Sequence, residues 1–191
     1  MLNIASITDD SIVDGPGIRL TIFMQGCNHR CDGCQNPSAL EFGVGKNITV
    51  EQVTERVFAN PLLSGITLSG GEPFAQAKEC ATLCKHIKNN NTNIQKDISN
   101  RLTNSKLPIQ SNHLTIWCYT GYLLEDLQER ARTDIDIQNL MQQIDVLVDG
   151  PFEKSQKDLN LIYKGSKNQR IIDLPQSLAT NKVILYPIEY S

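Results

Sequence analysis

Histidine and tryptophan are scarce in this chain, which has three histidines and one tryptophan among 191 residues. Histidine is the commonest general base in enzymes, and the Gly-x-Ser-x-Gly stretch that presents a nucleophilic serine is missing as well. The sequence therefore gives no support to a hydrolase that pairs a nucleophile with a general base.

Positive charge is not in excess either. The 18 Lys and Arg residues are outnumbered by 21 Asp and Glu residues, for a formal net charge of −3. Without a basic field, nucleic acid is not expected as a partner. The longest apolar run is far too short to cross a bilayer, so no membrane partner is expected. With 40% hydrophobic residues, the composition fits one globular domain over residues 1–191.

No secretory leader is expected either, because the chain opens Met-Leu-Asn-Ile without a charged segment followed by an apolar one. We therefore expect a cytoplasmic protein whose thiols stay reduced. Cys80 and Cys84 are spaced i, i+4 on an expected helix, and Cys118 falls in an expected strand. These three are predicted to be small buried hydrophobes.

What the chain does have is a second group of cysteines at close spacing. Cys27, Cys31 and Cys34 form the pattern Cys-x3-Cys-x2-Cys directly after the apolar residues 20–24 and Gly26. Three thiolates on one short loop, without a fourth partner, suit an iron–sulfur cube better than a closed zinc site. Such a cube has one open iron, which can bind and activate a small molecule.

Zinc stays open as an alternative from spacing alone. A structural zinc site takes four ligands, usually as two cysteine pairs or with regularly spaced histidines. Cys34 has no second pair to meet. His29 lies inside the loop and is either a fourth ligand or, as is more usual, a hydrogen-bonding residue.

Apolar runs and helical patterns alternate along the chain, which predicts an α/β fold with parallel βα units. A Thr49–Gln52 capping box opens one of the helices. The expected strands are residues 4–7, 20–25, 65–68, 114–119, 145–148 and 183–186, and the expected helices are 49–60, about 75–86, 123–132 and 137–144. A polar, Asn-rich excursion over about residues 89–112 has weak periodicity and is expected at the surface, in part as helix.

Residues 65–73 predict a strand that ends in a Gly70-Gly71 turn and runs through Glu72 and Pro73 into a helix. Paired glycines let the backbone approach a ligand closely and leave N–H and C=O groups free to bind it. A Gly-Gly turn alone is weak evidence, since most merely reverse the chain. In a parallel α/β fold, however, ligands bind at the carboxyl ends of the strands, where both this turn and the cysteine loop should lie.

The cysteine pattern followed by Gly-Gly-Glu-Pro resembles the radical S-adenosylmethionine enzymes. Residues 13–19, Val-Asp-Gly-Pro-Gly-Ile-Arg, are similar to the signature of glycyl-radical-enzyme activating enzymes. Three further stretches resemble the branch that activates anaerobic ribonucleotide reductases. They are 117–121, Trp-Cys-Tyr-Thr-Gly, then 145–152, Asp-Val-Leu-Val-Asp-Gly-Pro-Phe, and 165–173, Gly-Ser-Lys-Asn-Gln-Arg-Ile-Ile-Asp.

The resemblance implies a short, partly open parallel (β/α) barrel of the radical S-adenosylmethionine type. The cofactors it implies are a [4Fe-4S] cluster on Cys27, Cys31 and Cys34, and S-adenosylmethionine. It implies no catalytic side chains beyond these cofactors. The implied contacts to S-adenosylmethionine are Gly33, Cys34, Gln35, Gly70, Gly71 and Glu72, of which Gly33 stands where many relatives have an aromatic residue.

The implied activity is reductive cleavage of S-adenosylmethionine and formation of a glycyl radical on the large subunit of anaerobic ribonucleotide reductase. An electron donor such as flavodoxin or ferredoxin is a further implied partner. Three alternatives stay open: another glycyl radical enzyme as the target, a small-molecule substrate of the deazaguanine type, or a non-enzymatic iron–sulfur or zinc module.

Several charged residues of these motifs have a structural interpretation as well as a functional one. Asp14 is expected to cap the Gly-Pro-Gly turn and Arg19 to pair with a carboxylate, unless both border the partner's entrance. Asp149 and Asp173 are expected to cap the turns that follow their strands. Residues 168–170, Asn-Gln-Arg, are a candidate docking cluster.

Overall fold

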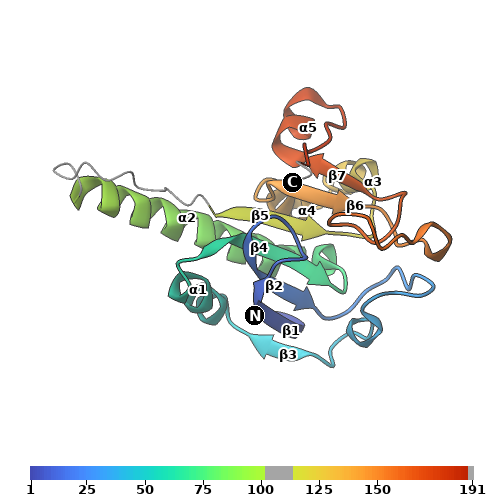
Figure 1. Ribbon diagram of the computed structural model, residues 1–191, viewed down its shortest axis with the longest axis horizontal. Helices are drawn as coiled ribbons and strands as arrows, with labels where there is room; N and C mark the ends of the chain where they lie inside the picture. The colour runs from blue at the N-terminus through green and yellow to red at the C-terminus, as the bar shows by residue number, and fades with distance from the viewer. Residues whose placement is uncertain (102–113, 189–191) are drawn as a thin grey trace.

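The computed structural model describes residues 1–101 and 114–188, with the backbone alone over 93–101. It is an α/β protein with one seven-stranded sheet, ordered β3-β1-β2-β4-β5-β6-β7 (Figure 1). Four central strands run parallel: β2 (Ile18–Met24), β4 (Leu63–Gly70), β5 (Thr115–Tyr119) and β6 (Val146–Asp149). The outer strands β1 (Leu2–Ser11), β3 (Lys46–Ile48) and β7 (Arg170–Asp173) are antiparallel to their neighbours.

The sheet is open, with β3 and β7 at opposite edges of the strand order. The predicted α/β class and the parallel centre of the sheet are confirmed, whereas closure into a barrel is not seen. The antiparallel edges also depart from the prediction of parallel units throughout, because β1 and β2 are joined by a loop too short for a helical crossover.

The α-helices pack mainly against one face of the sheet. Residues Leu20, Ile22 and Met24 of β2 join one apolar core with side chains from every helix. Cys80, Cys84 and Cys118 are fully buried in this core, as predicted. The helices are α1 (Val50–Ala59), α2 (Ala77–Arg101), α3 (Leu124–Arg130), α4 (Ile135–Met141) and α5 (Leu174–Thr180). Short 3-10 turns are η1 (Pro37–Ala39), η2 (Pro73–Gln76) and η3 (Lys154–Gln156).

The other face of the sheet is covered by loops and by the C-terminal segment. Trp117 and Val148 form a second apolar cluster here, against which Tyr119, Tyr163 and Tyr186 pack. Strand residues point alternately to the two faces, so β5 sends Trp117 and Tyr119 to this side and Cys118 to the helices. The loop face is therefore the one that contains polar and aromatic residues near the ends of the parallel strands.

Arg19 of β2 is fully buried on the loop face. Its five N–H groups donate to the carbonyls of Pro16, Ile66 and Thr115 and to the hydroxyls of Thr67 and Thr115. Burial lowers the pKa of its guanidinium to about 10. The prediction that Arg19 pairs with a carboxylate is wrong, because every acceptor that the described residues supply to it is neutral. Arg19 instead ties the 13–17 loop, dark blue in Figure 1, to β4 and β5.

Several elements differ from those predicted. The Thr49–Gln52 capping box is present, but α2 continues well past residue 86, to Arg101, and extends beyond the sheet (Figure 1). Residues 89–101 of the predicted excursion are thus helical, and its remainder lies outside the described residues. Residues 183–186 form no strand but line the edge of β7 through a single bridge, Ile172 to Leu185. None of the helices in the described residues has the length and apolar character needed to cross a membrane.

Candidate functional site

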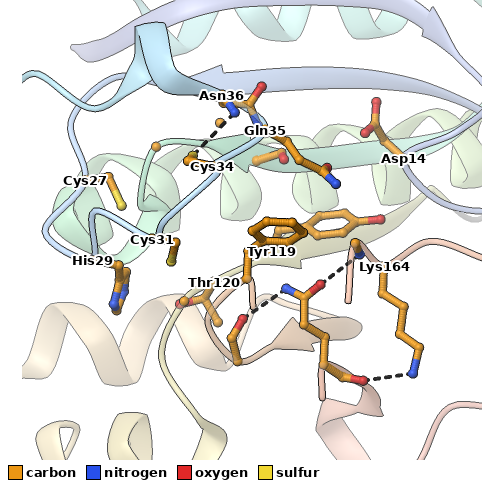
Figure 2. Close-up of a pocket in the computed structure, with 18 of the residues that line it drawn as sticks. Asp14, Cys27, His29, Cys31, Cys34, Gln35, Asn36, Tyr119, Thr120 and Lys164 are labelled. Carbon is orange, nitrogen blue, oxygen red and sulfur yellow. Dashed lines mark hydrogen bonds between the residues drawn. The ribbon is translucent and has the colours of Figure 1, made fainter. Parts of the chain in front are cut away.

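A cavity of about 500 Å³ lies where the four parallel strands end. Its walls come from the cysteine loop after β2, the Gly70-Gly71 turn after β4, the Thr120-Gly121 turn after β5 and the segment after β6. Figure 2 shows Cys27 and Cys31 toward one end, Asp14 and Lys164 toward the other, and Tyr119 between them. The expected meeting of the cysteine loop and the glycine turn in one cavity is confirmed.

Backbone hydrogen bonds fix the start of the cysteine loop and close its last turn. Cys27 N–H donates to Leu40 at 3.0 Å, and Cys34 N–H donates to Cys31 at 3.1 Å. Asn36 N–H donates to the sulfur of Cys34 at 3.4 Å (Figure 2). This contact fixes the position of the Cys34 sulfur relative to the backbone that follows it.

All three loop cysteines are free thiols of intermediate exposure. Burial raises the pKa of the Cys27 thiol above its ordinary value. Across the described residues, no three His, Cys, Asp or Glu side chains are arranged to hold a single metal ion. A [4Fe-4S] cluster binds each cysteine through a different iron, so its ligands need not converge on one point. Three thiols lining one cavity therefore fit such a cluster.

The Gly70-Gly71 turn lies against the strand that carries the cysteine loop. Gly70 has a φ of 89°, and a Cβ there would lie 2.6 Å from the backbone of Phe23. A Cβ on Gly71 would lie 2.4 Å from the carbonyl oxygen of Gly26. Gly71 N–H donates to Met24, and the next N–H, of Glu72, donates to Gly26, both at 2.8 Å. Contrary to expectation, these two N–H groups are used within the protein, and the glycines serve to bring two backbones together.

Glu72 is fully buried next to the turn. Its carboxylate accepts hydrogen bonds from the Thr120 hydroxyl, from Gly121 N–H and from Phe74 N–H at the start of η2. Its Oε2 lies 2.9 Å from His29 Nε2. Of the two roles considered for His29, the structure shows the hydrogen-bonding one.

The end of the cavity opposite the cysteines is aromatic and polar. Tyr119 donates its hydroxyl to the carbonyl of Tyr163 at 3.0 Å, and burial raises the pKa of Tyr119 above its usual range. Lys164 donates to the carbonyl of Gln169 at 3.0 Å. Asp14 accepts from the Ser11 hydroxyl at 2.6 Å. Within the described residues this bond lies ahead of the Gly-Pro-Gly turn, so the expected capping of that turn by Asp14 is not confirmed.

The proposed docking cluster at residues 168–170 is engaged within the protein. Asn168 donates to Pro151, and the Gln169 side chain bonds Gly150 and Gly165. Arg170 forms ion pairs with Asp149 and Glu125. Hydrogen bonding to these carboxylates raises the pKa of Arg170. The three residues hold the loop after β6, so only Gln169 also lines the cavity.

Of the two strand-end aspartates, Asp173 caps the turn that follows its strand, as expected, whereas Asp149 bonds the start of a helix 25 residues earlier in the chain. Asp149 accepts from Leu124 N–H at 2.8 Å, at the start of α3. Asp173 accepts from Gln176 N–H at 3.0 Å as the N-cap of α5.

The predicted site residues all line the cavity except Gly33, which lies against the Lys154 side chain. The structure adds lining residues that the sequence did not single out for the site. The added residues include Phe23, Tyr119, Thr120, Gly121, Tyr163 and Lys164. Their only signal was position, since Tyr119 to Gly121 directly follow an expected strand and so lie at its carboxyl end.

Comparison with known proteins agrees with this geometry. Residues 13–172 match the family described as a 4Fe-4S single cluster domain. The open α/β fold and its three-cysteine loop thus belong to an iron–sulfur class of protein.

Curated relatives narrow the class. The anaerobic ribonucleoside-triphosphate reductase-activating protein of Haemophilus influenzae is 30% identical over 84% of this chain and 90% of its own length. The protein of the same name from Escherichia coli K12 is 33% identical over 83% and 90%, and that of Enterobacteria phage T4 is 30% identical over 89% and 93%. The chain belongs to the family of anaerobic ribonucleoside-triphosphate reductase-activating proteins.

Proposed function

We propose that the chain is a radical S-adenosylmethionine enzyme that generates a glycyl radical on the large subunit of anaerobic ribonucleotide reductase. One observation carries the proposal: three cysteines and a Gly-Gly turn line the same cavity, in a chain of this family.

Cys27, Cys31 and Cys34 would hold the [4Fe-4S] cluster. When reduced, the bound cluster supplies one electron that cleaves S-adenosylmethionine to methionine and a 5′-deoxyadenosyl radical. Each cysteine is partly exposed, so the cluster end of the cavity lies near the surface. A small electron-transfer protein of the flavodoxin or ferredoxin kind is the proposed donor.

The glycine turn supports a place for the methionine end of S-adenosylmethionine. The N–H groups of Gly71 and Glu72 are occupied within the protein. The ammonium group of S-adenosylmethionine needs acceptors, and the carbonyl oxygens of this turn are of that kind. Gln35 extends across the cavity toward Gly165, where a Cβ would lie 2.8 Å from Gln35 Nε2. Gln35 and Cys34 therefore remain the proposed neighbours of the nucleotide, whereas Gly33 does not line the cavity and has no side chain to offer.

The far end of the cavity supports entry of a partner peptide. Its walls there are loops rather than strands, since the sheet is open. Two lining residues of this end, Val13 and Leu159, are 71% and 87% exposed. Exposed apolar residues at the rim of a cavity are typical of a surface that another chain covers. A glycine of the partner, inserted here, would lose a hydrogen atom from its α-carbon to the 5′-deoxyadenosyl radical.

The test is anaerobic activation of the reductase. The reconstituted protein, S-adenosylmethionine, a reductant and the large subunit should yield methionine, 5′-deoxyadenosine and an organic radical signal on the reductase. Replacing the partner's radical-bearing glycine by alanine should remove that signal. Cleavage of S-adenosylmethionine without any radical on the reductase would instead favour a small-molecule substrate or another glycyl radical enzyme.

A further inference from the structure

We propose that Glu72 is a positioning residue that fixes the cysteine loop through His29, and that it acts on the cluster rather than on S-adenosylmethionine. This proposal rests on the proposed cluster site. It replaces the contact to S-adenosylmethionine that the family resemblance implies for Glu72, and it gives His29 a role that the cysteine pattern leaves open.

The acceptor positions of Glu72 are already taken. The side chain is fully buried and receives hydrogens from Thr120, Gly121 and Phe74. His29 meets its Oε2 at 2.9 Å. A ligand that bound this carboxylate would have to displace one of these partners at the cost of a buried hydrogen bond.

His29 is confined by the same turn. A Cβ on Gly121 would lie 2.4 Å from the imidazole, so the ring rests directly on that glycine. The ring of Tyr122 meets it edge-on, with centroids 4.4 Å apart and an interplanar angle of 72°. The imidazole is thus held by Glu72, which follows β4, and by the Gly121–Tyr122 turn after β5.

The middle of the cysteine loop has few other attachments. In the described residues, its other side-chain contacts are exposed ion pairs. One joins Arg30 to Glu41 at 3.5 Å, with side chains 66% and 68% exposed, and the other joins Asp32 to Lys154 at 3.7 Å. Exposed pairs contribute little. The His29–Glu72 contact is therefore the buried link that sets where Cys27 and Cys31 stand.

Groups behind metal ligands affect how firmly a metal is held, and their removal typically costs 10- to 100-fold in affinity. Glu72 joins three segments at once, since its carboxylate bonds the loop after β2 and the turn after β5 from its place after β4. Removing His29 should loosen the cluster end while leaving the cap of η2 intact.

The experiment compares His29→Ala, Glu72→Gln and Glu41→Gln as reconstituted full-length proteins. The measurements are release of iron to a ferrous chelator, the electron paramagnetic resonance line shape and the midpoint potential of the cluster. His29→Ala should release iron about 10-fold faster and alter both spectrum and potential. Glu72→Gln should release iron faster than wild type but no faster than His29→Ala, because its amide keeps one acceptor oxygen and turns an NH2 group toward the N–H of Gly121 or Phe74.

Glu41→Gln is the matched control. It breaks the exposed pair to the same loop and should leave all three measurements unchanged. In the double variant His29→Ala/Glu72→Gln, the effects should not exceed those of His29→Ala, since both residues act in one link.

Wild-type iron release and an unchanged spectrum in His29→Ala would overturn the proposal, even if the wild type cleaves S-adenosylmethionine. A larger loss in Glu72→Gln than in His29→Ala would overturn it too, because it would show that the carboxylate acts elsewhere. If the variants behave as expected but the wild type cleaves no S-adenosylmethionine, the positioning role stands and the proposed function fails.

Discussion

At the scale of single residues, the loops around the cavity depend on buried polar side chains. Arg19 and Glu72 are both fully buried, and each bonds backbone groups of neighbouring segments. A buried charge is tolerated only when its hydrogen-bonding capacity is satisfied. Both residues therefore act as fixed points for loops that have no regular structure of their own.

The first prediction concerns the cysteines. Replacing Cys27, Cys31 or Cys34 by Ala should abolish the [4Fe-4S] absorbance and spin signal, because each supplies one of the three thiolates. Iron and sulfide content after anaerobic reconstitution provides the measurement.

Cys80→Ala and Cys84→Ala are the matched controls. Both thiols are fully buried behind the sheet, and burial raises the pKa of Cys84 to about 12, which keeps it protonated. They should lose some stability and keep the cluster. A Cys80 variant without cluster beside a Cys27 variant with it would refute the ligand assignment.

The second prediction concerns Arg19. Arg19→Lys keeps the charge but offers three donors in place of five, which leaves buried carbonyls unpaired. The free energy of unfolding should fall by about 2–4 kcal/mol. Urea denaturation under anaerobic conditions gives this value.

Arg56→Lys provides the comparison, since Arg56 pairs with Asp9 at the surface with side chains 44% and 53% exposed. It should cost at most about 1 kcal/mol. If Arg19→Lys and Arg56→Lys lower the free energy of unfolding equally, the buried hydrogen bonds of Arg19 stabilise the fold no more than a surface ion pair does.

Residue contacts were the least predictable part of the site. The Cys-x3-Cys-x2-Cys pattern indicated the proposed cluster ligands, because the three cysteines are close together in the sequence. His29 and Glu72 are 43 positions apart, and no local pattern links them. Arg19 was expected to meet a carboxylate, yet its acceptors are carbonyls and hydroxyls whose positions depend on strand register.

At the scale of elements, the cavity depends on the contact between the cysteine loop and the Gly70-Gly71 turn. Two backbone hydrogen bonds, both 2.8 Å long, join this turn to Met24 and Gly26. The turn thus supports the segment that carries Cys27, in addition to lining the cavity.

The third prediction follows from this contact. Gly71→Val should displace the backbone at Gly26 and so lower cluster occupancy as well as the affinity for S-adenosylmethionine, because its Cβ would lie 2.4 Å from that carbonyl. Iron content and binding titrations measure the two effects.

Gly43→Ala controls for the loss of a glycine. A Cβ there meets open space, and the substitution carries only the cost of a left-handed residue, about 1–2 kcal/mol. It should keep the cluster. A Gly71→Val protein that is fully loaded and binds S-adenosylmethionine normally would contradict the account of the turn.

The fourth prediction concerns the extension of α2. Ile87 is the last residue of α2 in the apolar core among those whose side chains are described, and Lys88 makes an ion pair with Asp145 at 2.9 Å. Replacing residues 91–111 by a short Gly/Ser linker should therefore spare folding and the cluster, since loop closure costs little. Circular dichroism and iron content test this.

The same variant separates two roles of the segment. Normal cleavage of S-adenosylmethionine with no radical on the reductase would make the segment a docking element. Failure to fold would show that residues 91–111 belong to the core.

Element prediction succeeded where apolar runs were long and buried. The central strands were found because both faces of a parallel sheet are covered, which gives continuous apolar runs. Strand β3 is only three residues long, and β7 is four, so neither has a detectable period. Residues 183–186 have the composition of a strand but meet the edge of β7 at one bridge, a contact made by tertiary packing.

At the scale of the whole molecule, the place of the cavity followed from topology. Parallel strands end at one edge, so the cysteine loop, the glycine turn and the Thr120-Gly121 turn had to meet there. That the sheet is open was harder to predict, because closure into a barrel depends on the outer strands, whose direction the sequence did not reveal. The loop walls that result are the feature that admits a partner chain in the proposed function.

The most direct test of the account is electron paramagnetic resonance of the reduced, anaerobically reconstituted protein with and without S-adenosylmethionine. The account predicts a [4Fe-4S] signal that changes shape when S-adenosylmethionine is added, and that is lost in Cys27→Ala. A cluster signal unaffected by saturating S-adenosylmethionine, or zinc in place of iron in a folded protein, would contradict it.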